Sequence, residues 1–131
     1  MRKRILVADI PDSDRRLTAI LNGHELAFAR TLGEAQRLLA QAGFDLIVVG
    51  VHFDDSRMFD LVRHVRGGGQ SEPPVACVRS HRFVSPALSV EGLEVAARAV
   101  ACNLFLDLTK YADDASGNAE VRQRLEALFT P

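Results

Sequence analysis

Short apolar runs recur along the chain and are separated by segments with a helical apolar period. Runs of three or four apolar residues, rich in β-branched types, predict strands that are buried on both faces of a sheet. These runs are Ile5–Ala8, Leu46–Val49, Val75–Val78 and Leu104–Leu106. A more weakly alternating stretch at His24–Ala29 predicts a strand at a sheet edge. The apolar pattern therefore predicts five strands.

A predicted helix follows each strand. Met58, Leu61, Val62 and Val65 fall at i, i+3, i+4 and i+7, which places them on one helix face. Helix starts are expected at Asp12 or Ser13, about Gly33, Ser56 and Ser85-Pro86, and the fourth helix should turn Leu93, Ala96, Ala97 and Val100 inward. A turn-rich break at Asp113–Asn118 is expected before a last helix with Val121, Leu125, Leu128 and Phe129 on its apolar face.

Five strands alternating with five helices predict an α/β fold. The expected form is a flavodoxin-like (βα)5 doubly wound parallel sheet with right-handed crossovers and strand order 2-1-3-4-5. A length of 131 residues fits one domain over residues 1–131. Ligands bind at the carboxyl ends of the strands in such sheets, so the loop Gly50–Asp55 is the first place to look for chemistry.

Composition narrows the possible functions. A net charge of -1 gives no basic footprint for nucleic acid, and the length leaves no room for an added helix-turn-helix. No apolar run approaches membrane-spanning length, and the run after Arg4 is too short for a signal peptide, so a cytoplasmic protein with no membrane partner is expected. Cys77 and Cys102 lie in apolar sequence and are interpreted as buried thiols in a reducing compartment.

The element order and several local patterns resemble the receiver domains of bacterial two-component response regulators, the CheY-like family. The matching stretches are Arg4–Asp9, Asp45–Val49, Pro74-Val75 and Ala101 before the fifth strand. The resemblance implies a phosphorelay signalling module whose functional residues stand at the strand ends.

The acidic side of that family pattern is incomplete in this chain. An acidic pair ends the family's first strand and helps to bind magnesium, whereas here Asp9 is kept and Ile10 replaces the second acid. The phosphoacceptor aspartate ends the family's third strand, and the resemblance places Gly50 there. The family's Met-Pro becomes Phe53-Asp54, and its glycine early in the third helix becomes Met58.

The positions that would hold the phosphoryl group also differ. Arg79 stands where the family has Thr or Ser, with Ser80 one residue beyond. Asp107 stands at the family's lysine position, and Lys110 would fit only if the alignment slips. Leu104 replaces the switch aromatic residue. With Asp9 as the only remaining acid, magnesium has little reason to bind, so we interpret the chain as a degenerate pseudo-receiver with no metal or other cofactor.

Two interpretations of the replaced residues remain open. Arg79 could bridge Asp9 and Asp107 through charge-assisted hydrogen bonds and lock the pocket without phosphate. Alternatively, Arg79 and Asp107 could point into water as solvated loop charges that contribute little.

The sequence also suggests two other kinds of site. Asp54 or Asp55 could act as a surrogate phosphoacceptor, although Asp55 or Ser56 more naturally caps the third helix. The polar loop of Arg79, Ser80, His81 and Arg82 could bind an anion in a small-ligand sensor. His52 lies near Asp54 and Asp55 in the sequence, but no third metal ligand stands at suitable spacing. The histidines His24, His64 and His81 are expected at the surface or in loops, and no nucleophile–base–orienter set suggests an enzyme.

The function expected from the resemblance is protein–protein interaction without conventional aspartyl phosphorylation. The partner would be a signalling protein, such as a histidine kinase or an output protein, or a second copy of this chain in a homodimer. The expected surface consists of the fourth helix, fifth strand and fifth helix, at about Glu91–Arg98, Leu104–Lys110 and Glu120–Leu128.

Overall fold

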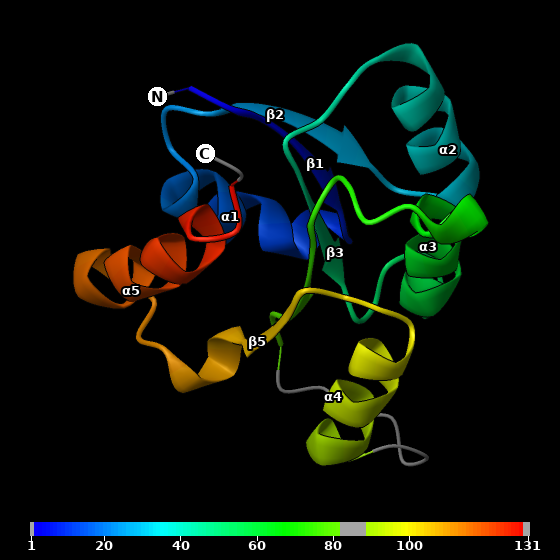
Figure 1. The fold of residues 1–131 in the computed structure, drawn as a ribbon. Helices are drawn as coiled ribbons and strands as arrows, with labels where there is room; N and C mark the ends of the chain where they lie inside the picture. The colour runs from blue at the N-terminus through cyan, green and yellow to red at the C-terminus, as the bar shows by residue number, and fades with distance from the viewer. Residues whose placement is uncertain (1, 82–88, 130–131) are drawn as a thin grey trace.

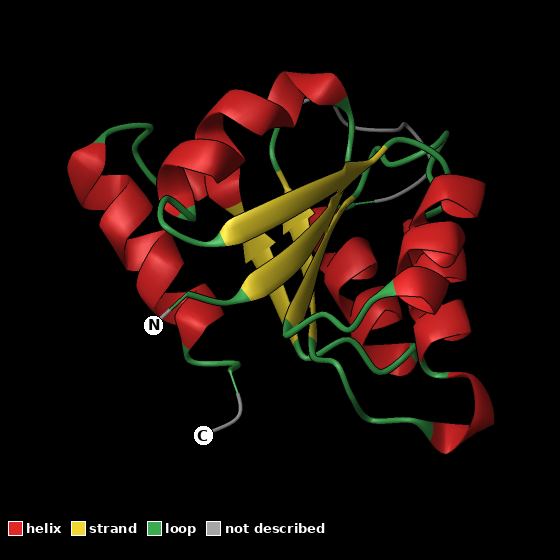
Figure 2. Ribbon diagram, turned by 90° about the horizontal axis from the view of Figure 1, so that it is seen from above, coloured by secondary structure: helices red, strands yellow, loops and turns green. Residues whose placement is uncertain are grey.

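The computed structural model describes residues 2–81 and 89–129. One parallel sheet of five strands forms its centre, in the order β2-β1-β3-β4-β5, and Figure 2 shows the strands between two layers of helices. The strands are β1 (Arg4–Ala8), β2 (Glu25–Ala29), β3 (Leu46–Gly50), β4 (Val75–Arg79) and β5 (Leu104–Asp107). The predicted flavodoxin-like fold and strand order are confirmed, with β2 at an edge as expected.

Helices cover both faces of the sheet. Two of them, α1 and α5, lie together on one face, while α2, α3 and α4 cover the other (Figure 1). The helices are α1 (Asp14–Ile20), α2 (Leu32–Gln41), α3 (Met58–Val65), α4 (Val90–Ala99) and α5 (Ala115–Glu126), with short 3-10 turns at Pro11–Ser13, Gly67–Gly69 and Leu108–Lys110. None of these helices is long and apolar enough to cross a membrane, in the part of the chain that the structure describes.

The central strands are apolar throughout because they face a core on each side. Ile5, Val7 and Val48 pack with the helices α1 and α5, whereas Leu6 and Val49 pack with the helices of the opposite face. All five are fully buried. Burial on both faces explains why these strands appear in the sequence as continuous apolar runs.

The start of α3 differs from the sequence prediction. The helix begins at Met58 rather than Ser56, and Arg57 stands at its N-cap without a side-chain capping bond. Asp54, Asp55 and Ser56 adopt positive φ angles of 44°, 55° and 68°. Non-glycine residues enter this left-handed region at a cost in free energy. The residues expected to cap α3 therefore form a left-handed turn before it.

The start of the last helix also differs from the sequence prediction. The helix α5 begins at Ala115, inside the predicted break, because the Asp114 carboxylate accepts a hydrogen bond from the Gly117 N–H at 2.9 Å and caps the helix. His24 lies in the loop before β2, but its side chain is only 2% exposed, and its Nε2 lies 2.7 Å from Glu126 on α5. The predicted start of the fourth helix at Ser85-Pro86 lies outside the described residues.

Candidate functional site

The carboxyl ends of β1, β3, β4 and β5 bring the predicted site residues to one edge of the sheet. Asp9 follows β1 directly, and Gly50 is the last residue of β3. Arg79 ends β4 and is paired in register with Asp107, which ends β5. Asp107 is therefore the residue at the end of β5, while Lys110 lies beyond the strand, in the 3-10 turn.

The side chain of Asp9 fills the space that a side chain at position 50 would need. A Cβ atom placed on Gly50 would lie 2.0 Å from Asp9 Oδ1 and 2.2 Å from Oδ2. These distances are far below any real contact, so the Asp9 carboxylate lies directly over the end of β3. The glycine at the expected phosphoacceptor position therefore leaves a space that a neighbouring acid occupies.

Asp9 is a buried acid, and its neighbours offset only part of the free-energy cost of its burial. It is 2% exposed, and its Oδ1 accepts a hydrogen bond from the Ile10 N–H at 2.8 Å. Its Oδ2 lies 3.5 Å from the Ser80 hydroxyl, at the limit of a hydrogen bond. Burial raises the pKa of Asp9, and the hydrogen bond from Ile10, together with the neighbouring Ser13, His81 and His52 side chains, offsets only part of that effect. The ionised carboxylate is therefore a cost to the folded protein.

Replacing Asp9 with asparagine tests this cost. A raised pKa in the folded state means that the folded protein binds a proton more readily than the unfolded chain, so wild-type stability falls as pH rises through that pKa. We expect Asp9→Asn to be more stable than wild type at pH 7 and the difference to shrink as pH is lowered. Urea unfolding of both proteins in steps from pH 7 to about pH 4 measures it. A difference that does not change with pH would contradict the pKa shift.

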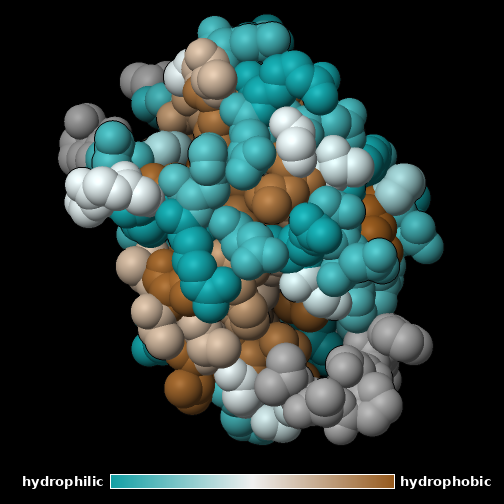
Figure 3. Space-filling view, turned by 90° about the vertical axis from the view of Figure 1, so that its right-hand side faces the viewer, coloured by the Kyte–Doolittle hydropathy of each residue, from teal (hydrophilic) through white to brown (hydrophobic). Residues whose placement is uncertain are grey.

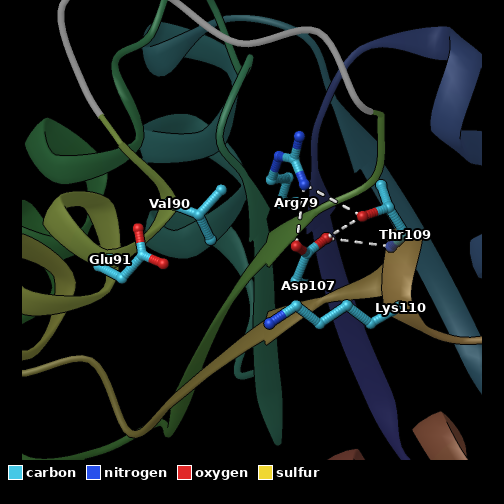
Figure 4. Close-up of a pocket in the computed structure, with 6 residues that line it drawn as sticks. All are labelled: Arg79, Val90, Glu91, Asp107, Thr109 and Lys110. Carbon is cyan, nitrogen blue, oxygen red and sulfur yellow. Dashed lines mark hydrogen bonds and ion pairs between the residues drawn. The ribbon is translucent and has the colours of Figure 1, made fainter.

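On the other side of the edge, Arg79, Asp107 and Thr109 form a compact network (Figure 4). The Arg79 guanidinium donates to Asp107 Oδ2 at 2.8 Å and to the Thr109 hydroxyl at 3.0 Å. Asp107 Oδ1 in turn accepts from the Thr109 hydroxyl at 2.6 Å and from its backbone N–H at 3.0 Å. Arg79 and Asp107 are only 8% and 9% exposed. They are therefore not the solvated loop charges of the second interpretation.

Of the bridge in the first interpretation, only the side toward Asp107 is present. Among the described residues, Arg79 forms its ion pair with Asp107, while Asp9 turns toward β3. Burial opposes ionisation of Asp107, but the hydrogen bonds from Thr109 and Arg79 together keep its pKa below the ordinary value. The two carboxylates of the site therefore have opposite pKa shifts, and Arg79 does not join them.

Sequence reasoning missed Thr109, which completes this network. The signal was available, because an aspartate followed two residues later by threonine often accepts bonds from that residue's N–H and hydroxyl in a turn. Ile10 and Leu104 are half-buried, and Leu104 packs against the apolar core. These two residues, which the resemblance places at the family's second acid and switch aromatic residue, add no polar side chain to the site.

The two residues considered as surrogate phosphoacceptors lie in the left-handed turn before α3. Asp54 Oδ2 accepts a hydrogen bond from the Leu32 N–H at 2.8 Å, which ties it to the first residue of α2. Asp55 is exposed. The structure therefore does not bring either residue into the network of Arg79, Asp107 and Thr109.

The residues at this edge do not fit magnesium. That ion needs carboxylates that point outward with room for several waters, whereas the Asp9 carboxylate is buried over Gly50. Asp107 is already held by Arg79 and Thr109. Within residues 2–81 and 89–129, no group of three or more His, Cys, Asp or Glu side chains is placed to hold a metal ion.

A shallow cavity of about 360 Å³ lies beside the network, between it and the start of α4 (Figure 4). It is lined by Arg79, Val90, Glu91, Asp107, Thr109 and Lys110. Two acids and two bases face it, so it offers no single charge to an anion. Of the loop residues predicted to bind an anion, Arg79 is paired with Asp107, Ser80 lies near Asp9, and Arg82 lies outside the described residues.

Comparisons with known proteins rest on structure alone. No protein-family model matches the chain, and no curated protein matches its sequence. A response regulator from Thermotoga maritima superimposes with a TM-score of 0.73 at 17% identity, covering 98% of each chain. The chemotaxis response regulator CheY4 of Vibrio cholerae gives 0.72 at 20% identity, covering 95% of this chain and 99% of that one. The chain has the receiver-domain fold.

A third similar structure was solved as a complex with Mg²⁺-BeF. The response regulator TrrA from Thermotoga maritima, solved with Mg²⁺-BeF, gives a TM-score of 0.69 at 17% identity over 97% of this chain and 99% of that chain. The match covers nearly all of both chains. At this identity the likeness establishes the fold, and the chemistry must be argued from the side chains of this receiver-fold chain.

Proposed function

We propose that this receiver-fold protein is an atypical signalling module that acts through protein–protein contact without aspartyl phosphorylation. The observation that carries the proposal is the position of Asp9, whose carboxylate fills the space over Gly50. A phosphoacceptor in the receiver pattern needs a carboxylate on β3 and a metal-binding acid on β1. Here the first is missing, and the second is buried where the first would stand.

The remaining half of the site supports the same proposal. A phosphoryl group would need a free cation and a hydroxyl to hold its oxygens. Arg79 and Thr109 have these groups, but both are bonded to Asp107. An arriving phosphoryl group would have to displace a buried carboxylate from its partners, so the network favours one fixed arrangement of the β4 and β5 ends.

The proposed contact surface is formed by α4, β5 and α5, by analogy with the family. Val95 on α4 is 69% exposed, which is unusual for an apolar side chain. Figure 3 shows apolar side chains gathered at the lower end of one face of the molecule, the end where Figure 1 places α4. The proposed partner is a histidine kinase, an output protein or a second copy of the chain in a homodimer.

One experiment separates this proposal from a phosphorylated receiver. The protein is incubated with a small phosphodonor and magnesium, and its intact mass and its association state by light scattering are measured before and after. We expect no mass increase and no change in association. A mass increase that Asp54→Asn or Asp55→Asn abolishes would support the surrogate phosphoacceptor instead.

The contact surface is tested in the same samples. Val95→Glu places a charge on the exposed face of α4 without touching the core, so it should weaken any self-association that wild type shows. Arg63→Glu, on an exposed position of α3, is the matched control and should leave the association unchanged.

A further inference from the structure

The strand β2 ends the sheet on one side and leaves a backbone edge without a neighbouring strand. Within the described residues it pairs with β1 alone, whereas each central strand has a neighbour on both sides (Figure 2). Leu26, Ala27 and Phe28 in its middle are partly exposed, while the residues of β1 that align with them are fully buried. Such an edge can pair with a further strand, because its unpaired N–H and C=O groups already lie in a row.

Two residues of β2 direct their backbone hydrogen-bonding groups to this open side. The Glu25 N–H donates to the Lys3 carbonyl at 2.9 Å, so Glu25 bonds toward β1. Successive residues of a strand bond to alternate sides, and Ala27 therefore bonds toward β1 as well. Leu26 and Phe28, between and beyond them, each present one N–H and one C=O to the open side.

The residues of β2 do not protect this edge against pairing. Natural sheet edges usually carry lysine, proline or an inward-pointing charge that prevents another strand from binding. The sequence of β2 is Glu-Leu-Ala-Phe-Ala, with its single charge at the first position. The other edge strand, β5, has four residues, and its Leu104 carbonyl accepts a hydrogen bond from the Cys102 thiol at 3.3 Å. β2 is therefore the edge that is better suited to a further strand.

The order of residues in β2 matches a second copy of itself running antiparallel. With a two-fold axis beside Ala27, Leu26 lies opposite Phe28 of the second copy, and Phe28 lies opposite its Leu26. These are the outward residues, so each pair exchanges both of its N–H···O=C bonds. A register shifted by two residues would set Phe28 opposite His24, or Leu26 opposite Arg30, and both of these side chains are bonded to acids of their own chain.

The side chains of both faces suit the same register. Leu26 and Phe28 turn to the face covered by α1 and α5, so apolar side chains meet across the two strands. On the opposite face Ala27 meets Ala27 of the second copy, at a pair where antiparallel strands approach to about 4.5 Å between Cα atoms. A small side chain fits there. Glu25 lies opposite Ala29 of the second copy and so meets no like charge.

We propose that β2 pairs with β2 of a second copy, antiparallel and centred on Ala27, so that one sheet continues through two chains. The contact buries only one strand edge of each chain, so it is weak and forms as the protein concentration rises. It goes beyond the proposed α4 surface, because α4 packs against β5 at the opposite edge of the sheet. Two modules joined at β2 therefore keep both α4 surfaces free for another partner.

The contact is tested by sedimentation velocity in Val95→Glu protein, so that association through the α4 surface does not contribute. We expect dimer to form between about 10 µM and about 1 mM. Ala27→Lys sets two ammonium groups opposite each other at the axis and should weaken this association about tenfold or more. Ala19→Lys, the same substitution at an exposed position of α1, should leave it unchanged. A monomer at every concentration, or equal association in folded Ala27→Lys protein, would overturn the proposal.

The register is tested with single cysteines, which gives an answer even if Ala27→Lys does not fold. The variants are made in Cys102→Ser protein, in which the remaining thiol, Cys77, is fully buried. Ala27→Cys sets two thiols face to face and should give an intermolecular disulfide under mild oxidation. Glu25→Cys is more exposed, but its two copies lie about 13 Å apart along the strands and should not cross-link. Equal cross-linking of both variants, or none in Ala27→Cys, contradicts the proposed pairing.

Discussion

Replacing Asp107 with alanine is expected to lower the free energy of unfolding by about 3–5 kcal/mol. The substitution leaves the Arg79 guanidinium, only 8% exposed, without its ion-pair partner. It also leaves the Thr109 N–H and hydroxyl without the Asp107 oxygen that they share. Urea unfolding at pH 7 measures the change. An exposed ion pair between an acid and an arginine, Glu94 with Arg98, provides the control, and Glu94→Ala should cost less than about 1 kcal/mol.

A double variant separates the cost of the unpaired charge from the loss of the pair itself. Replacing a buried ion pair by apolar residues of similar volume is often neutral or stabilising. Arg79→Met with Asp107→Leu should therefore recover most of the stability that Asp107→Ala loses. If Asp107→Ala cost less than about 1 kcal/mol, the network would be too weak to fix the site.

The same network has a defined pH dependence. The pKa of Asp107 is lower in the folded protein than its ordinary value. Its contribution to stability is therefore complete above that ordinary value and is lost as pH falls through the lowered pKa. Asp9 changes in the opposite sense and at higher pH, because its pKa is raised. As pH falls, Asp9 should be protonated first, which removes the free-energy cost of its buried charge. The Arg79–Asp107 pair should weaken only at lower pH, when Asp107 is protonated.

Adding a single methyl group at Gly50 is the second large expected effect. Gly50→Ala places a Cβ 2.0 Å from Asp9 Oδ1, so the carboxylate must leave its position in a site that is 2% exposed. Overpacking of this kind costs about 1–3 kcal/mol, and we expect the upper part of that range because Asp9 has little room to turn. Thermal or urea unfolding measures the loss.

A double-mutant cycle with Asp9 identifies the cause. Asp9→Ala removes the atoms that the new Cβ would meet, so Gly50→Ala should cost much less in the Asp9→Ala protein than in wild type. Gly43→Ala is the control, because nothing lies within 4 Å of a Cβ at that position. Equal costs of Gly50→Ala in both backgrounds would mean that Asp9 does not occupy the space over β3.

The sequence by itself determined the fold, because each element depends on local patterns. The apolar runs Ile5–Ala8 and Leu46–Val49 become strands buried on both faces, and the helical spacing of Met58 to Val65 becomes the inner face of α3. Buried positions recur with the period of the helix or strand, so they can be recognised in the sequence as a pattern of apolar residues. The absence of a carboxylate at Gly50 was visible for the same reason, since position along a strand fixes which residue ends it.

Only the tertiary structure decided which side chains meet. Asp9 turned toward Gly50 rather than Arg79, Thr109 joined Asp107, and Asp54 bonded to the start of α2. His24 pairs with Glu126, which lies far away in the sequence, and its side chain is buried. A buried polar group takes the partner that the packed backbone places within hydrogen-bond distance, and that choice also depends on the cost of leaving water. Neither the distance to such a partner nor the cost of leaving water can be derived from the sequence pattern alone.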